Sequence, residues 1–149
     1  MGLITVGVDH SAGSNAALRF ALEEARVREA TLRVVHAWQF GYVGATGMEG
    51  LLPTVGGELD EFRRAAAAEL ETILADADAG GVEIETRIEQ GSAASILIDE
   101  SQDAELLVVG SRGHGGFASL MLGSVSQQCA QHAACPVVIV RDRPAQEAA

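Results

Sequence analysis

The sequence predicts a single α/β domain in which helices cover both faces of an open parallel sheet. The first observation is that short apolar stretches, typical of buried strands, alternate with longer amphipathic stretches, typical of helices. The second is the length of 149 residues, which is ordinary for one domain and sufficient to bury a core. The third is the composition, since 48% apolar and 21% charged residues are typical of a folded domain.

The N-terminal part predicts a strand, a helix and a second strand. Residues 3–8 are apolar and β-branched, which indicates a buried strand. Ser11 and Ser14 are candidate N-caps of a helix that extends to about Arg28 and carries alanine and leucine at helical spacing. Residues 32–37 form another short apolar stretch and predict the second strand.

The middle of the chain predicts a loop, a long helix and a more exposed strand. Residues 40–57 are rich in glycine and predict a long loop. Residues 58–78 are strongly amphipathic and predict a helix, which Gly80 and Gly81 end as a left-handed cap requires. Residues 82–88 alternate apolar and polar side chains and predict the third strand.

The last third predicts a short helix, a buried strand, another helix and a final strand. Ser92 is a candidate N-cap of a helix that extends to Ser101. Residues 106–109 predict the fourth strand, residues 125–132 a helix, and residues 137–140 the fifth strand. Because helices alternate with strands, we expect the strands to be parallel and joined by right-handed crossovers.

The most informative motif lies between the fourth strand and the helix that follows it. It reads Gly110-Ser111-Arg112-Gly113-His114-Gly115-Gly116, and Gly123-Ser124-Val125-Ser126 comes after it. A glycine-rich turn before a helix presents backbone N–H groups to a phosphate, and glycine permits close approach to the anion. Hydroxyl groups at the helix start add donors where the helix dipole is positive. The sequence therefore predicts a nucleotide-phosphate site.

This motif resembles the nucleotide-binding signature of the universal stress protein family. Two residues separate Gly110 from Gly113, and nine more precede Gly123-Ser124, which is the spacing of that signature. The resemblance is weak around residues 40–57 but otherwise covers nearly the whole chain. It extends to Val6-Gly7-Val8-Asp9, Val34-Val35-His36-Ala37 and Cys135-Pro136-Val137-Val138-Ile139-Val140. It implies a Rossmann-like sheet of the adenine nucleotide alpha hydrolase-like type, with strand order 3-2-1-4-5.

The resemblance also implies a ligand crevice between the first and fourth strands. The strand order reverses there, and open α/β sheets bind ligands beyond the carboxyl ends of the strands at such a point. By resemblance, Asp9 contacts the adenosine part of a nucleotide, while Gly7 and the Ala37 backbone line the adenine pocket. Asp9 as a cap of the following helix is an alternative that is compatible with this role. The candidate nucleotide-binding residues are Gly7, Asp9, Ala37, Val109, Gly110, Ser111, Arg112, Gly113, His114, Gly115, Gly116, Gly123, Ser124, Val125 and Ser126.

Several side chains in or near this set have defined expected roles. Ser124 and Ser126 are expected to donate their hydroxyl groups to phosphate oxygens. Arg112 and His114 either contact a phosphate or lie in solvent at the tip of the loop, and the sequence leaves both alternatives open. His36 is expected to be a packed, hydrogen-bonded strand residue and not a ligand of the nucleotide.

The charge and the composition of the chain argue against binding to nucleic acid and to membranes. The net charge is −11 and the only adjacent basic pair is Arg63-Arg64, which opposes binding to nucleic acid or to an anionic membrane. No apolar run approaches the roughly 18 residues that span a bilayer.

No signal peptide is apparent, so we expect a cytoplasmic protein. Cys129 and Cys135 lack a metal-binding or redox spacing and are expected to be small buried side chains. We expect a domain at residues 1–143 and a disordered tail at residues 144–149.

The chain lacks the residues of common catalytic sites. It contains no lysine, which excludes a Walker A loop, and no Ser-His-Asp motif or metal-ligand spacing of histidines is evident. The missing lysine also opposes a receiver-type domain, and an aromatic content of 4% opposes a flavin site. We therefore predict no catalytic residue and no protein metal site. ATP, with Mg²⁺ held by its phosphates, is expected to be bound with little or no turnover.

Three functional hypotheses stay open at this stage. The first is an ATP-binding stress-response regulator or sensor, whose state an unidentified protein partner detects. The second is a weak ATPase, and the third is an interaction protein whose nucleotide site is structural or vestigial. The resemblance further implies a homodimer through the last strand, which consists of Val137, Val138, Ile139 and Val140.

Overall fold

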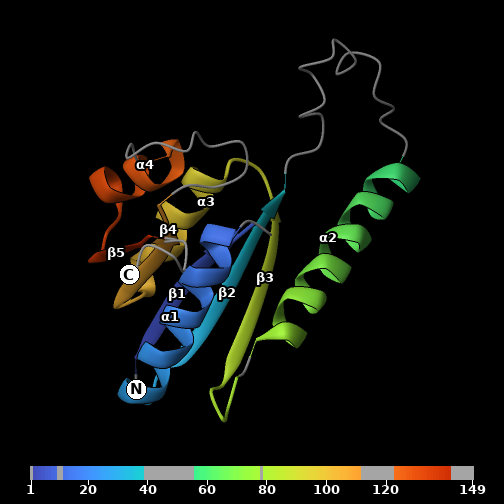
Figure 1. Ribbon diagram of the computed structural model, residues 1–149. Coiled ribbons are helices and arrows are strands. Elements are labelled where there is room, and N and C mark those ends of the chain that lie inside the picture. The colour runs from blue at the N-terminus through green and yellow to red at the C-terminus, as the bar shows by residue number, and fades with distance from the viewer. Residues whose placement is uncertain (1, 10–11, 39–55, 78, 112–122, 142–149) are drawn as a thin grey trace, which may run out of the picture.

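The protein folds as a five-stranded parallel sheet covered by helices (Figure 1). The computed structural model describes residues 2–9, 12–38, 56–77, 79–111 and 123–141. The strands lie in the order β3-β2-β1-β4-β5 and every neighbouring pair is parallel. The predicted fold class and the strand order implied by the resemblance are confirmed. The strands are β1 (Leu3–Val8), β2 (Thr31–Trp38), β3 (Ile84–Gln90), β4 (Leu106–Gly110) and β5 (Val137–Val140).

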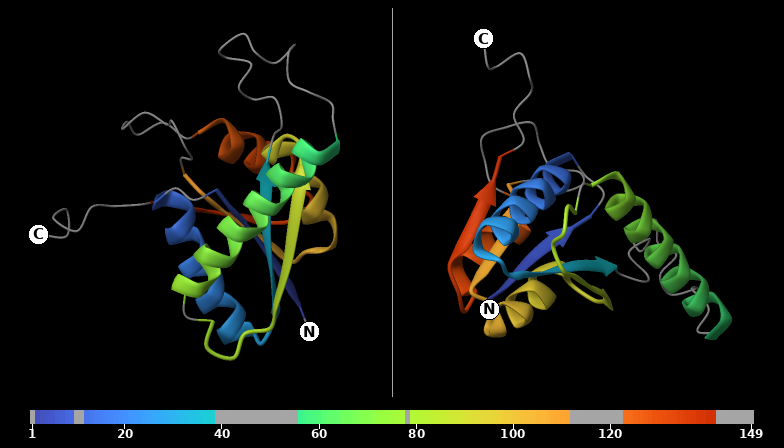
Figure 2. Two further views of the ribbon diagram at one scale, coloured as in Figure 1. Left: turned by 90° about the vertical axis from the view of Figure 1, so that its right-hand side faces the viewer. Right: turned by 90° about the horizontal axis from the view of Figure 1, so that it is seen from below.

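In the described part of the chain, two α-helices cover each face of the sheet (Figure 2). Side chains of α1 and α2 pack into the cluster on one face, and side chains of α3 and α4 pack into the cluster on the other. A short 3₁₀ turn, Ser101–Asp103, continues α3. The helices are α1 (Ala12–Arg28), α2 (Gly56–Asp76), α3 (Ala93–Glu100) and α4 (Ser124–His132).

The predicted boundaries differ from the observed ones by two residues at both ends of α2 and of β3. The strand occupies residues 84–90, two residues later than predicted, because its pairing with β2 begins at Leu32 opposite Ile84. The N–H of Val82 instead donates to the carbonyl of Ala79 in the turn, at 2.9 Å. Hydrophobic alternation alone does not distinguish a residue of the turn from the first residue of the strand.

The central strands are buried on both faces, as parallel strands between helix layers must be. Ile4 and Val6 of β1 are fully buried and pack in the cluster that α1 covers. On the opposite face, Leu107 and Val109 of β4 pack with Cys129 of α4. The ends of β1 and β4 are therefore held firmly by the core on either side.

A buried ion cluster, which the sequence did not reveal, joins β2, β3 and the α3 region. The side chain of Arg33 in β2 is 7% exposed, and its guanidinium lies 2.7 Å from the carboxylate of Glu100, whose side chain is 10% exposed. The same guanidinium contacts Glu85 at 2.8 Å and Asp103 at 3.0 Å. Arg87 contacts the second oxygen of Glu100 at 3.1 Å. A buried cation is tolerated here because carboxylates surround it.

The two cysteines are free thiols and differ in their accessibility. Cys129 is fully buried, whereas Cys135, just before β5, is partly exposed. Burial raises the pKa of Cys129 to about 11 and raises the pKa of Cys135 as well. Because the thiolate is the reactive form, we expect Cys135 to react much faster than Cys129 with a thiol reagent at neutral pH. Mass spectrometry of the labelled native protein measures how fast each thiol reacts. Equal labelling of both thiols would contradict the burial of Cys129 on α4.

Candidate functional site

The carboxyl ends of β1 and β4 lie side by side at the point where the strand order reverses. Ile4, Thr5 and Val6 pair with Leu106, Leu107 and Val108 in parallel register. Strand β1 therefore ends just before Asp9 at the same edge of the sheet where β4 ends at Gly110. Open α/β sheets bind ligands at such an edge, because the connecting helices diverge there.

Asp9 and Gly110 both contact the first turn of α1. The backbone N–H of Asp9 donates to Ser14 Oγ at 3.1 Å, so Ser14 caps the end of β1 from inside the helix. A Cβ on Gly110 would lie 2.8 Å from the carbonyl carbon and oxygen of Gly13 and 3.3 Å from the nitrogen of Ser14. Gly110 is thus required for close backbone packing of β4 against α1, in addition to its predicted role in the turn.

The start of α4 is tied directly to the end of β4. Gly123 is the N-cap residue, with φ −73° and ψ 167°, and its N–H donates to the Ser111 carbonyl at 2.8 Å. Ser111 in turn donates its N–H to the carbonyl of Val140 at 2.9 Å. As the N-cap residue, Gly123 offers no side-chain acceptor to the N–H groups of the first turn of α4. The first turn of α4 therefore lies directly beside the end of β4.

Ser126 has a different environment from the one expected of a phosphate ligand. Its side chain is buried, and Oγ lies 3.1 Å from the Ser111 carbonyl and 3.0 Å from the Gly123 carbonyl. The single hydroxyl proton is therefore used within the protein. We therefore revise the prediction that Ser126 donates its hydroxyl to a phosphate. The hydroxyl instead links Ser111 to Gly123, the two residues between which the predicted phosphate loop lies. Ser124, in contrast, is exposed at the first position of α4.

The remaining described candidates contribute mainly through their backbone or through packing. Val109 is buried in the core, and Val125 packs against the same cluster, so their side chains do not face a ligand. A Cβ on Gly7 would lie 2.7 Å from Leu97 Cδ1 of α3, which accounts for the glycine by packing. Ala37 is partly exposed near the end of β2. The other candidates lie outside the described residues: Arg112, Gly113, His114, Gly115 and Gly116.

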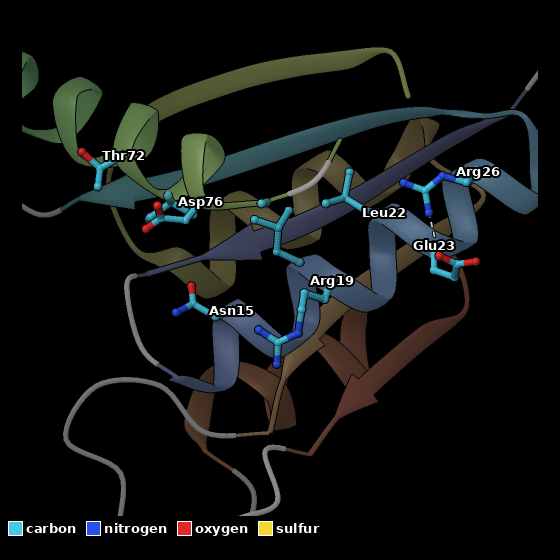
Figure 3. A pocket seen from close by; sticks show the side chains of 10 residues that line it. Asn15, Arg19, Leu22, Glu23, Arg26, Thr72 and Asp76 are labelled. Carbon is cyan, nitrogen blue, oxygen red and sulfur yellow. Dashed lines mark hydrogen bonds and ion pairs between the residues drawn. The ribbon is translucent and has the colours of Figure 1, made fainter. Parts of the chain in front are cut away.

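A separate groove of about 460 Å³ lies between α1 and α2 (Figure 3). Apolar side chains such as Leu18, Leu22 and Ile73 line it together with polar ones such as Arg19 and Asp76. Among the candidate nucleotide-binding residues that the structure describes, none lines this groove. It is therefore distinct from the crevice at the carboxyl ends of β1 and β4.

The part of the chain that the structure describes contains neither a metal-binding cluster nor a membrane-spanning helix. No cluster of three or more histidine, cysteine, aspartate or glutamate side chains there has the arrangement of a metal site. None of the described helices is long and apolar enough to cross a membrane.

The sequence matches the model of the Universal stress protein family over residues 1–141. The chain belongs to this family. A universal stress protein of Mycolicibacterium smegmatis is 35% identical over 146 residues, which cover 92% of this chain and 47% of that protein. The chain thus spans about half the length of that relative. Universal stress protein YxiE of Bacillus subtilis is 33% identical over 142 residues, and the match covers 91% of this chain and 96% of YxiE.

Solved structures share the fold of this universal stress protein. The hypothetical protein MJ0577 superposes with a TM-score of 0.79 at 16% identity, covering 97% of this chain and 98% of that one. A universal stress protein in complex with cAMP has a TM-score of 0.61 at 26% identity, covering 95% and 98%. A family member from Arabidopsis thaliana with AMP bound has a TM-score of 0.63 at 22% identity, covering 99% and 95%.

Proposed function

We propose that this universal stress protein binds an adenine nucleotide in the crevice between β1 and β4. The observation that carries the proposal is the convergence of Asp9, the Gly110-Ser111 end of β4 and the start of α4 at one edge of the sheet. Family members with cAMP or AMP bound support the class of ligand. Among adenine nucleotides we propose ATP, because the glycine-serine spacing resembles the family's nucleotide-binding signature.

The start of α4 is suited to bind the phosphates. A helix N-terminus combines free N–H groups with the positive end of the helix dipole, and the N-cap residue Gly123 has no side chain that would compete for those groups. The exposed hydroxyl of Ser124 adds a donor at this position. With a net charge of −11, the chain offers no broad positive field, so local donors must supply the attraction. Mg²⁺ would enter with the phosphates of ATP and neutralise part of their charge.

We propose a regulatory role with little or no turnover. Phosphoryl transfer depends on cations and metal ions that stabilise the transferred group, and the chain contains no lysine. ATP would instead act by holding together the ends of β1 and β4 and the start of α4, whose arrangement a protein partner would recognise. A weak ATPase would show slow phosphate release with bound Mg-ATP, which a steady-state phosphate assay measures.

We further propose that the protein is a cytoplasmic homodimer that pairs through β5. This strand is at the edge of the sheet, and all of its side chains are partly exposed. An apolar edge strand favours pairing with another strand. The two free thiols fit a reducing compartment. Sedimentation measurements on the wild type and on a Val138→Lys variant test the dimer, since a charge on β5 is expected to disfavour pairing.

Replacing Gly123 by leucine is expected to lower the affinity for ATP at least about tenfold, because a bulky side chain at the N-cap obstructs close approach of a phosphate. The fold is expected to persist, since the φ of −73° at Gly123 suits any residue. Calorimetric titration with ATP, AMP and cAMP gives the affinity for each nucleotide. Ala130→Leu is the matched control, because Ala130 is exposed on the same helix beyond its first turn. Unchanged ATP affinity of a folded Gly123→Leu protein would contradict the site.

A further inference from the structure

The peptide group between Val8 and Asp9 is held at both of its polar ends. Its carbonyl oxygen lies 3.1 Å from Nδ1 of His36 in β2, and its N–H donates to Ser14 Oγ of α1, also at 3.1 Å. A peptide group is planar, so fixing both polar atoms fixes its orientation. This clamp of His36 and Ser14 sets the direction in which the chain leaves β1, and thus the position of Asp9.

The chemistry of the contact defines which ring nitrogen of His36 carries a proton. A carbonyl oxygen only accepts hydrogen bonds, so Nδ1 must donate to Val8. The ring is buried, with a side chain that is 7% exposed, so water does not compete readily for this bond. In a neutral ring that makes this bond, the proton therefore lies on Nδ1.

Glu69 of α2 holds the opposite side of the same ring. Its carboxylate oxygen lies 3.2 Å from Nε2 of His36. When Nε2 is also protonated, this contact is a charge-assisted hydrogen bond, which is stronger than a neutral one. The Glu69 side chain is 38% exposed and reaches the ring from α2. In the neutral ring with its proton on Nδ1, Nε2 and the carboxylate are both acceptors, so Glu69 holds the ring only when Nε2 is protonated as well.

The neighbouring contacts of α2 support this arrangement. Leu70, next to Glu69, is buried in the core, which keeps this turn of α2 against the sheet. In the N-terminal half of the helix, the ring of Phe62 stacks on Trp38 at the end of β2, with centroids 6.4 Å apart and an interplanar angle of 8°. α2 therefore contacts β2 at Trp38 as well as at His36.

We propose that His36 is a positioning residue of the nucleotide site, which orients Asp9 by binding the Val8 carbonyl. The inference rests on the proposed function, since Asp9 is the predicted adenosine contact. His36 itself touches no nucleotide in this proposal. It acts through the Val8–Asp9 peptide, and Glu69 adds a hydrogen bond on the other side of the ring when Nε2 is protonated.

The protonation pattern of the ring is the first test, and it does not depend on a nucleotide. Nitrogen-15 NMR of the imidazole, assigned with the His36→Asn variant, is expected to show a proton on Nδ1 when the ring is neutral. Amide exchange is expected to accelerate at Asp9 in His36→Leu, because the peptide loses one of its two anchors. A neutral ring protonated on Nε2 would overturn the proposal, since the Val8 contact would then be absent.

Nucleotide affinity of matched variants is the second test. His36→Leu is expected to bind ATP about tenfold more weakly, which is the loss of one well-placed hydrogen bond. His36→Asn retains a donor near the position of Nδ1 and is expected to remain within about threefold of the wild type. His132→Leu is the control, because His132 is exposed in the last turn of α4. Circular dichroism melting establishes that each variant is folded.

The outcomes separate this inference from the proposed function. Weaker binding by His36→Leu, with near-normal binding by His36→Asn, supports the positioning role. Wild-type affinity of a folded His36→Leu protein overturns the role and leaves the nucleotide site standing. If His36→Leu does not fold, His36→Asn decides the outcome. A His36→Asn protein that loses ATP binding, while its Asp9 amide exchanges as in the wild type, would overturn the role. A wild-type protein that binds no adenine nucleotide overturns the proposed function and this role with it.

Discussion

Adding one methyl group to Gly110 is expected to lower the free energy of unfolding by about 2 kcal/mol, a typical cost of overpacking. The new Cβ would lie 2.8 Å from backbone atoms of Gly13 in α1, and backbone cannot move aside as a side chain can. β4 and α1 would have to separate, which displaces Ser111 and, through it, Gly123. The Gly110→Ala variant is therefore also expected to bind ATP more weakly. Urea denaturation and calorimetric titration measure the two effects.

Gly7→Ala provides a matched comparison for this variant. Its Cβ would also be too close to a neighbour, at 2.7 Å, but that neighbour is Cδ1 of Leu97, the end of a flexible side chain. The cost is expected to be about 1 kcal/mol, at the lower end for overpacking. Equal stability of Gly110→Ala and the wild type would show that the end of β4 does not pack against α1 as described.

Replacing Arg33 by methionine is expected to lower the free energy of unfolding by about 3 kcal/mol, as breaking a buried ion pair does. Methionine has a similar length but no charge, so the nearly buried carboxylate of Glu100 would lose one of the two cations, Arg33 and Arg87, that contact it in the described part of the chain. Arg28→Met is the control: Arg28 is exposed and pairs with Glu24 and Glu105 at the surface, and its loss is expected to leave stability nearly unchanged. Urea denaturation at neutral pH gives both values.

The same cluster predicts how stability depends on acid. The hydrogen bond from Arg33 holds the pKa of Asp103 below its ordinary value of 3.8. A lowered carboxyl pKa contributes stability above pH 3.8, and this contribution is lost as the pH falls from 3.8 through the pKa of the folded protein. In the Arg33→Met protein, this loss of stability below pH 3.8 should be absent. An unchanged acid profile in Arg33→Met would contradict the pairing of Arg33 with Asp103.

Hydrophobic periodicity was sufficient to predict the strands and helices, because each has one or two faces in the core. The strand order came from the resemblance, since periodicity does not tell which strands are neighbours. The Arg33 cluster was missed because its partners are distant in sequence: Glu85 and Glu100 are 52 and 67 residues away. A single arginine within the apolar stretch of residues 32–37 was the one available signal.

The candidate site was predicted in outline but not in the direction of its side chains. Sequence spacing places Ser126 in the first turn of α4, yet it does not tell that its hydroxyl binds the Ser111 and Gly123 carbonyls. Gly110 was predicted from its place in the turn, whereas its contact with Gly13 depends on how β4 packs against α1. The His36 contacts with Val8 and Glu69 likewise arise from three separate elements.

The melting temperature with and without excess Mg-ATP tests the central claim most directly. At a hundredfold excess over the dissociation constant, binding stabilises the folded state by about 2.7 kcal/mol. For a domain of this size we expect a rise of about 5–10 °C for the wild type and, with at least tenfold weaker binding, about half of that rise or less for Gly123→Leu. No rise in wild-type protein freed of bound nucleotide would contradict a nucleotide site between β1 and β4.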